Sequence, residues 1–157
     1  MEKKEREKIK NVAFFMAQKA FDADEVPVGA VVFNSETGQI VAKACNQTEK
    51  KKDVLAHAEM QAIHSASRKL GRKFLDGYSM YVTLEPCAMC AGAISWARLD
   101  AVFYGATDPK TGALRQGAKV FHRLQTHHKP KSQLISSAEC GEIMTRFFRG
   151  KRGLKKV

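Results

Sequence analysis

The sequence predicts a three-layer α/β domain in which a mixed sheet of about five strands lies between helices. Apolar residues recur at helical spacing in some segments and gather into short strand-like runs in others, and the two kinds of segment alternate along the chain. The chain has 157 residues, of which 44% are hydrophobic and 27% charged, enough for one domain with a sizeable core. We therefore expect one domain over residues 1–157.

The first half should contain a helix, a hairpin and a polar loop. Residues 5 to 23 place Ile9, Val12, Ala13, Met16 and Ala20 on one helical face. Two strands, 28 to 33 and 39 to 44, flank the turn sequence Ser-Glu-Thr-Gly. The polar stretch 49 to 53 contains three consecutive lysines, which we expect to be solvated.

The second half should alternate helices and strands. A helix from about 56 to 70 should end at Gly71, which suits a left-handed helix stop, and Pro86 stands where another helix can begin. The remaining elements are expected at 79 to 84 (strand), 87 to 97 (helix), 101 to 105 (strand), 133 to 136 (strand) and 138 to 150 (helix).

Positive charge is concentrated in the last third of the chain. Residues 1–108 carry 15 basic and 14 acidic side chains, whereas residues 109–157 carry 12 basic and two acidic ones, out of a net charge of +11. A basic region of this kind attracts a polyanion, although a solubilising tail is the alternative. Residues 146–152 also interleave aromatic and basic side chains, as single-strand binders do. At least one of Phe147 and Phe148 should pack against the core.

The composition points to an intracellular protein with metal or redox chemistry. No apolar run is long enough to span a membrane, and the first ten residues alternate Glu with Lys and Arg, unlike a signal peptide, so we expect a cytoplasmic location. The four cysteines are too few for a secreted disulfide scaffold.

Two short motifs carry the chemistry: His57-Ala58-Glu59 and Pro86-Cys87-Ala88-Met89-Cys90. Cys87 and Cys90 should lie one turn apart at a helix start, where unpaired backbone N–H groups favour the thiolate. Two sulfurs and the His57 imidazole suit Zn²⁺, and three ligands leave the open position of a catalytic site. Glu59 can then serve as a proton shuttle.

Each motif alone has other interpretations. A single Cys-x-x-Cys can be a redox pair or part of a structural zinc site, and a single His-x-Glu occurs by chance. Together, each at the start of an expected helix, they form the signature of the zinc nucleobase deaminases.

Much of the chain resembles the bacterial tRNA-specific adenosine deaminases. The matching segments are 25–30 (Glu-Val-Pro-Val-Gly-Ala), Asn46, 56–59 (Ala-His-Ala-Glu), 83–93 (Thr-Leu-Glu-Pro-Cys-Ala-Met-Cys-Ala-Gly-Ala), 108–113 (Asp-Pro-Lys-Thr-Gly-Ala) and 146–149 (Arg-Phe-Phe-Arg). The last two segments favour the tRNA branch of this superfamily.

The resemblance implies a cytidine-deaminase-like α/β/α fold and hydrolysis of the wobble adenosine of a tRNA anticodon to inosine, with release of ammonia. It implies a cytoplasmic homodimer that binds the tRNA anticodon loop and holds one zinc per chain without a nucleotide cofactor. His57, Cys87 and Cys90 match the zinc ligands and Glu59 the proton shuttle. Asn46 matches the residue that contacts the purine, and the tRNA contacts fall at Asp108, Lys110, Phe148, Arg149 and Arg152, the last three on a basic C-terminal helix from about 138.

Two other functions compete with this one. A deaminase of a free base or nucleoside, such as guanine or cytosine, would share the zinc site but would not need the basic, aromatic C-terminal helix. A zinc-stabilised RNA-binding module without activity would have a closed site with four protein ligands.

Several other residues have simpler interpretations. Without the resemblance, Asn46 would be taken as a turn former. Cys45 and Cys140 are expected to be buried packing residues, and His64 a packing or surface histidine. Trp96 and Phe103 are expected in the core or in a dimer interface.

Overall fold

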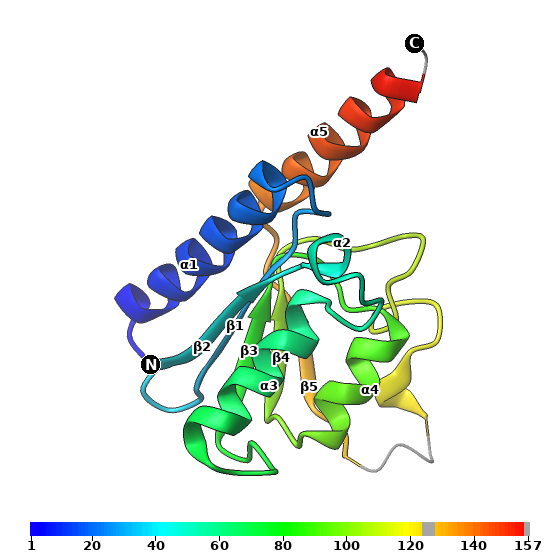
Figure 1. Cartoon of the computed structure of the whole chain (residues 1–157). Coiled ribbons are helices and arrows are strands. Elements are labelled where there is room, and N and C mark those ends of the chain that lie inside the picture. Colours follow the sequence, from blue (N-terminus) through cyan, green and yellow to red (C-terminus); the bar gives the residue numbers. More distant parts are fainter. Residues whose placement is uncertain (124–127, 156–157) are drawn as a thin grey trace.

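The computed structural model describes residues 1–123 and 128–155 (Figure 1). Its elements are α1 (Lys3–Asp22), β1 (Gly29–Asn34), β2 (Ile40–Cys45), α2 (Thr48–Lys51), α3 (Ala58–Leu70), β3 (Tyr78–Val82), α4 (Ala88–Trp96), β4 (Ala101–Tyr104), the 3-10 turn η1 (Val120–His122), β5 (Lys131–Leu134) and α5 (Ala138–Lys155). The strands form one five-stranded sheet in the order β2-β1-β3-β4-β5.

The sheet is mixed and has helices on both faces, which confirms the predicted three-layer fold. β1 runs antiparallel to β2 and β3, whereas β3, β4 and β5 are parallel. The helices α1 and α5 lie on one side of the sheet, and α3 and α4 lie on the other (Figure 1). Parallel strands joined by crossover helices normally have both faces covered in this way.

The strand β1, which lies between β2 and β3 in the sheet, shows why the core is divided between two faces. Ala30 and Val32 belong to the large cluster that includes α3 and α4, whereas Val31 and Phe33 pack with α1. All four are buried because successive side chains of a strand point to opposite faces. Gly29 allows the close approach of α1, since a Cβ there would overlap the Ala13 carbonyl oxygen.

Most boundaries lie within two residues of the predictions, but two elements were not expected and the last helix is longer. The stretch expected as a loop at 49 to 53 contains the single helical turn α2, which ends at Lys52 with a positive φ of 51°. η1 was not expected, and β5 begins two residues earlier than predicted. α5 continues past Gly150 to Lys155, because a glycine in a helix of this length costs only about 1 kcal/mol.

The last helix is fixed to the end of the first. Phe147 is 8% exposed and meets the Phe21 ring edge-on at 6.0 Å, while Lys151 pairs with Asp24 at 2.6 Å. Phe148 is 43% exposed. The expectation that at least one of the two phenylalanines packs against the core is therefore confirmed.

The packing predictions for Cys45, Cys140 and Phe103 are confirmed, whereas one of the two alternatives for Trp96 is wrong. Cys45 and Cys140 are buried free thiols, and Phe103 is partly buried and stacks on Phe33 at 6.4 Å. Trp96 is 69% exposed, so the core alternative for this residue is wrong. In the part of the chain that the structure describes, every helix is too short or too polar to cross a membrane.

Candidate metal centre and substrate pocket

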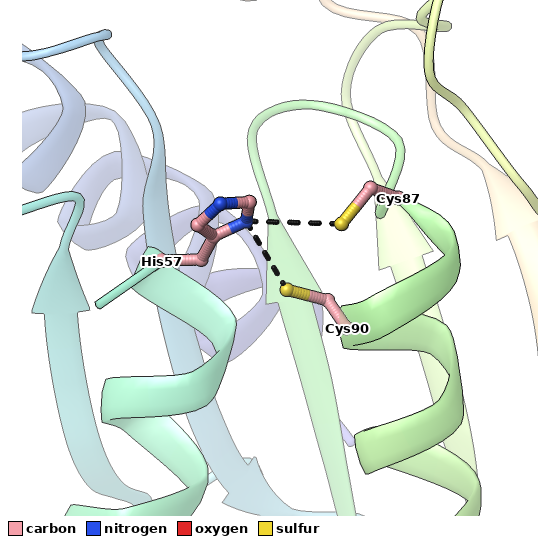
Figure 2. A group of neighbouring side chains, drawn as sticks. All are labelled: His57, Cys87 and Cys90. Atoms are coloured by element: carbon pink, nitrogen blue, oxygen red, sulfur yellow. Dashed lines mark hydrogen bonds between the residues drawn. The ribbon is translucent and has the colours of Figure 1, made fainter. Parts of the chain in front are cut away.

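Two helix starts meet at the expected metal group. His57 is the N-cap residue of α3 and Cys87 that of α4, and Cys90 lies in the first turn of α4. α3 and α4 pack against each other on the same face of the sheet, so their first turns bring the three side chains together. Figure 2 shows the imidazole of His57 facing both sulfur atoms.

The distances in this group fit tetrahedral coordination. His57 Nδ1 lies 3.7 Å from Cys87 Sγ and 3.5 Å from Cys90 Sγ. A tetrahedral zinc ion with bonds of about 2.3 Å to sulfur and about 2.1 Å to nitrogen would separate these atoms by about 3.6 Å. Within residues 1–123 and 128–155, the group that could hold a metal ion contains these three residues and no fourth ligand. These three residues would leave one coordination position open, whereas a purely structural zinc site is closed by four protein ligands.

The two thiols have different proton affinities. A hydrogen bond with the Cys90 thiol lowers the pKa of Cys87 to about 5, and backbone amides of the first turn of α4 and His57 act in the same direction against the effect of burial. The same hydrogen bond and burial raise the pKa of Cys90. One thiolate is thus formed readily at a helix start, where the positive end of the dipole favours it.

Glu59 lies in the first turn of α3 and is 4% exposed. Burial raises its pKa to about 7; the nearby Cys87 adds to this effect, whereas His57 opposes it. A carboxyl group with this pKa can both accept and donate a proton near neutral pH, as general acid–base catalysis requires. Its side chain lines the same pocket as His57 and Cys87.

A pocket of about 720 Å³ opens above this group. Pockets for small ligands and cofactors have volumes of about 300–1,000 Å³, so a single nucleoside fits. Its walls combine the metal group and Glu59 with apolar residues such as Val26, Leu84 and Met144. The site can therefore hold a planar base with one reactive atom beside the metal group.

Asn46 lies in the wall of this pocket and is 6% exposed. Its side-chain amide donates to the Val26 carbonyl at 3.3 Å, and its side-chain oxygen accepts the Thr48 N–H at 3.4 Å. The residue therefore has both features expected of it, a turn-forming hydrogen bond and a position beside the base pocket.

Asp108 and Lys110 lie in a loop that borders the same pocket. The Asp108 carboxylate accepts the backbone N–H of Lys110 at 3.0 Å and the Thr111 hydroxyl at 2.7 Å, so it shapes the turn. Lys110 itself is exposed. The structure thus gives Asp108 a folding role in addition to the expected substrate contact.

The expected RNA contacts on α5 divide into two groups. Phe148 and Arg152 line the pocket, whereas Arg149 is exposed but lies outside its wall. A helix turns about 100° per residue, so neighbouring positions cannot all face one pocket. Of the six residues expected to contact the substrate, five line the pocket and Arg149 does not.

Sequence reasoning assigned no role to Glu85, which holds the 108–115 loop in place. It is 2% exposed; its Oε1 accepts the Asp108 N–H at 3.1 Å, and its Oε2 accepts the N–H groups of Leu114 and Arg115, both at 3.0 Å. A Cβ on Gly112 would lie 2.5 Å from the Glu85 carboxyl carbon, so the loop packs directly on this carboxylate.

Glu25 holds the start of α2, where Thr48 lines the pocket, in the same way. It is 2% exposed, and its two oxygens accept the N–H groups of Glu49 and Lys50, both at 2.9 Å, at the start of α2. A helix start has unpaired N–H groups that a carboxylate can satisfy. For Glu85 the available signal was its position in the otherwise apolar stretch 84–87, where burial of a carboxylate requires a partner; Glu25 follows two aspartates and gave no such signal.

Comparison with known proteins gives a consistent result. A family model described as MafB19-like deaminase matches residues 4–152. A tRNA-specific adenosine deaminase of Agrobacterium fabrum (strain C58) is 43% identical over 149 residues, which covers 94% of this chain and 97% of the relative.

Solved structures show the same fold. A structure from a study of tRNA:A34 deaminases that edit A to I at the wobble position aligns with a TM-score of 0.80 and 43% identity, over 83% of this chain and 98% of the other. A guanine deaminase from Nitrosomonas europaea aligns with a TM-score of 0.76 and 20% identity, over 88% of this chain and 82% of that one. At that lower identity the likeness concerns the fold alone.

Proposed function

The chain belongs to the tRNA-specific adenosine deaminase family, and from this premise we propose that it converts the wobble adenosine of a tRNA anticodon to inosine by hydrolysis. The observation that carries the proposal is the three-ligand group with Glu59 in one nucleoside-sized pocket, in a chain 43% identical to such a deaminase over nearly its whole length. Deamination of free guanine or cytosine is less well supported, because guanine deaminases of Nitrosomonas europaea and Bacillus subtilis share 20% and 27% identity with this chain, against 43% for the structure from the tRNA:A34 deaminase study.

His57, Cys87 and Cys90 would hold one Zn²⁺ per chain. When bound, zinc lowers the pKa of a water molecule enough to supply a nucleophile at neutral pH. The donor set supports this choice, because thiolate and imidazole favour zinc over the hard cations magnesium and calcium. The depressed pKa of Cys87 supports it as well, since metal binding requires a deprotonated sulfur.

Glu59 would move the protons of the reaction. Its carboxylate accepts a proton from the attacking water and passes it to the purine ring nitrogen beside C6, which makes C6 more electrophilic. It then takes the proton of the new C6 hydroxyl group and passes it to the amino group; the C6–N bond breaks, ammonia leaves, and the oxygen remains as the C6 carbonyl of inosine. A pKa of about 7 suits a group that must both take and give a proton.

The remaining pocket residues would position the RNA. Asn46 would contact the purine, while the Asp108–Lys110 loop, Phe148 and Arg152 would contact nucleotides at the entrance. We also assign Arg149 to RNA binding, outside the pocket wall. An anticodon loop suits this site, because its bases leave the stack at lower cost than those of a duplex.

We also propose a cytoplasmic homodimer, with no nucleotide cofactor. Two large apolar side chains that a dimer could cover are strongly exposed: Val54 at 80% and Trp96 at 69%. A tRNA substrate accounts for the cytoplasmic location.

A direct assay tests the function. Purified protein is incubated with tRNA that carries A34, and with free adenosine, guanine and cytosine, and the products are separated as nucleosides and bases. We expect inosine in the tRNA alone, formed roughly 10²–10⁴ times more slowly with Glu59→Gln. Turnover of the free compounds without inosine in tRNA would reject the proposal in favour of a small-molecule deaminase.

A further inference from the structure

A second cleft, of about 880 Å³, lies along the edge strand β2 on the far side of the 46–57 segment. We call it the basic cleft, because five cationic side chains from four different elements line it. They are Lys19 of α1, Lys43 of β2, Lys51 of α2, and Arg68 and Lys69 of α3. Nothing in the sequence signalled this cluster, because these residues are spread over fifty positions of the charge-balanced part of the chain.

The cleft has an excess of positive charge that the protein itself does not neutralise. Among the residues that the structure describes, Asp53 is the one carboxylate in its wall. All five cations are exposed, and the ion pairs found among the described residues involve Lys10 and Lys151, not these five. Lys51 donates to the side-chain oxygen of Gln61 at 2.6 Å, a neutral partner that leaves its charge in place. An anionic partner would therefore be attracted to this surface.

The basic cleft shares a wall with the substrate pocket. Gln47 and Ala56 line the cleft, whereas their immediate neighbours Asn46, Thr48 and His57 line the pocket. Thus a polymer whose base enters the pocket can continue over this wall into the cleft. Lys110 and Arg152 lie in the pocket, so cations occur both there and beyond this wall.

We propose that the basic cleft binds the phosphodiester backbone of the RNA substrate on one side of the target nucleotide. This proposal rests on the proposed function, because it takes the polymer entering the pocket to be RNA. Exposed cations from four elements, spread over the wall of one cleft, suit successive phosphates, which stay partly hydrated. A single small anion would instead be held by donors that converge on one point. Phosphate contacts of this kind set the position of a nucleic acid without reading its sequence.

The test compares matched charge-neutralising variants at the two edges of the sheet. Lys43→Gln/Lys69→Gln removes two charges from the basic cleft; Lys129→Gln/Lys131→Gln removes two beside β5, at the opposite edge. All four lysines are exposed, so neither variant disturbs the core. Lys51 is left unchanged because of its bond to Gln61.

The primary measurement is equilibrium binding of the zinc-loaded protein to full-length tRNA as a function of salt. We expect the cleft variant to bind roughly tenfold more weakly at low salt. The slope of log K against log salt should fall by about 2, because each lysine removed leaves one phosphate with its counterions. The opposite-edge variant should behave as the unmodified protein does. The kcat for inosine formation should be the same in all three.

Other outcomes separate the two proposals. If the cleft variant binds tRNA with unchanged affinity and slope, the basic cleft is not an RNA surface. If it changes the molar mass of the protein in solution, the cleft is an interface between copies, which also overturns the proposal. If the unmodified protein binds tRNA but makes no inosine, the proposed function fails while the binding comparison still decides the role of the cleft.

Discussion

The centre of the substrate pocket and its rim are built in different ways. The centre consists of four residues at the starts of α3 and α4, and the three candidate metal ligands among them have their ligand atoms within 4.8 Å of one another. The rim consists of exposed side chains on a loop and on α5, which reach the pocket from separate parts of the chain. Its shape depends on two buried glutamates, Glu25 and Glu85, whose carboxylates accept backbone N–H groups.

This difference separates chemistry from recognition. At the centre every side chain has one position and one task, so the loss of any one should stop the reaction. At the rim the binding energy is spread over several partly solvated contacts, each of modest value. Four substitutions, taken from the largest expected effect to the smallest, can break or sharpen this comparison.

Cys90→Ala should have the largest effect, because it removes a fully buried residue of the proposed metal group. We expect less than one zinc per ten chains after dialysis and no detectable inosine. Metal analysis of the purified variant beside an activity assay gives both values. A variant that keeps a full complement of zinc and normal activity would show that the metal group is wrongly assigned.

Glu59→Gln should keep zinc and the fold but lose activity by a factor of roughly 10²–10⁴, the usual contribution of general acid–base catalysis. The amide has the same shape but cannot accept the proton of the attacking water. Single-turnover rates with tRNA, measured on protein of known zinc content, test this. Equal rates for the variant and the unmodified enzyme would exclude Glu59 as the shuttle.

Glu85→Gln should act on the rim without touching the centre. Its amide group would face backbone N–H donors of the 108–115 loop, so we expect a loss of roughly 1–3 kcal/mol in the free energy of unfolding. The KM for tRNA should rise more than kcat falls, because the loop carries Lys110. Urea unfolding and steady-state kinetics measure the two effects; a fall in kcat alone would assign Glu85 to the chemistry.

Arg152→Gln should have the smallest effect, and Arg149→Gln on the same helix compares a proposed RNA contact inside the pocket wall with one outside it. Arg152 lines the pocket and Arg149 does not. We expect Arg152→Gln to raise the KM for tRNA a fewfold and to lower the salt slope by about 1, because one phosphate then keeps its counterions. A larger effect of Arg149→Gln would mean that the RNA lies along the outer face of α5.

The sequence was most informative where function depends on neighbours in the chain. Cys87 and Cys90 are three residues apart at a helix start, and His57 and Glu59 are two apart at another, so local geometry alone placed each pair. The alternation of helical and strand patterns predicted the sheet for the same reason.

Features that depend on distant contacts could not be predicted in this way. Glu85 bonds to residues 23 to 30 positions away, and Glu25 to residues 24 and 25 positions away. Their partners are backbone groups, which leave no pattern in the sequence. The net charge of residues 1–108 is close to zero, so it gave no indication of the basic cleft. Folding nevertheless brings Lys43, Arg68 and Lys69 together on one surface.

The two buried glutamates have a consequence for how substrates are selected. The 108–115 loop and the start of α2 are each hydrogen-bonded to a buried carboxylate. We therefore expect the pocket to keep its shape when the substrate binds. The RNA must then change conformation, and the free energy of unstacking the target base reduces the binding affinity. The enzyme would then discriminate between RNA substrates by the free energy needed to bend the strand and flip the target base out. This favours a flexible hairpin loop over a double helix of the same sequence.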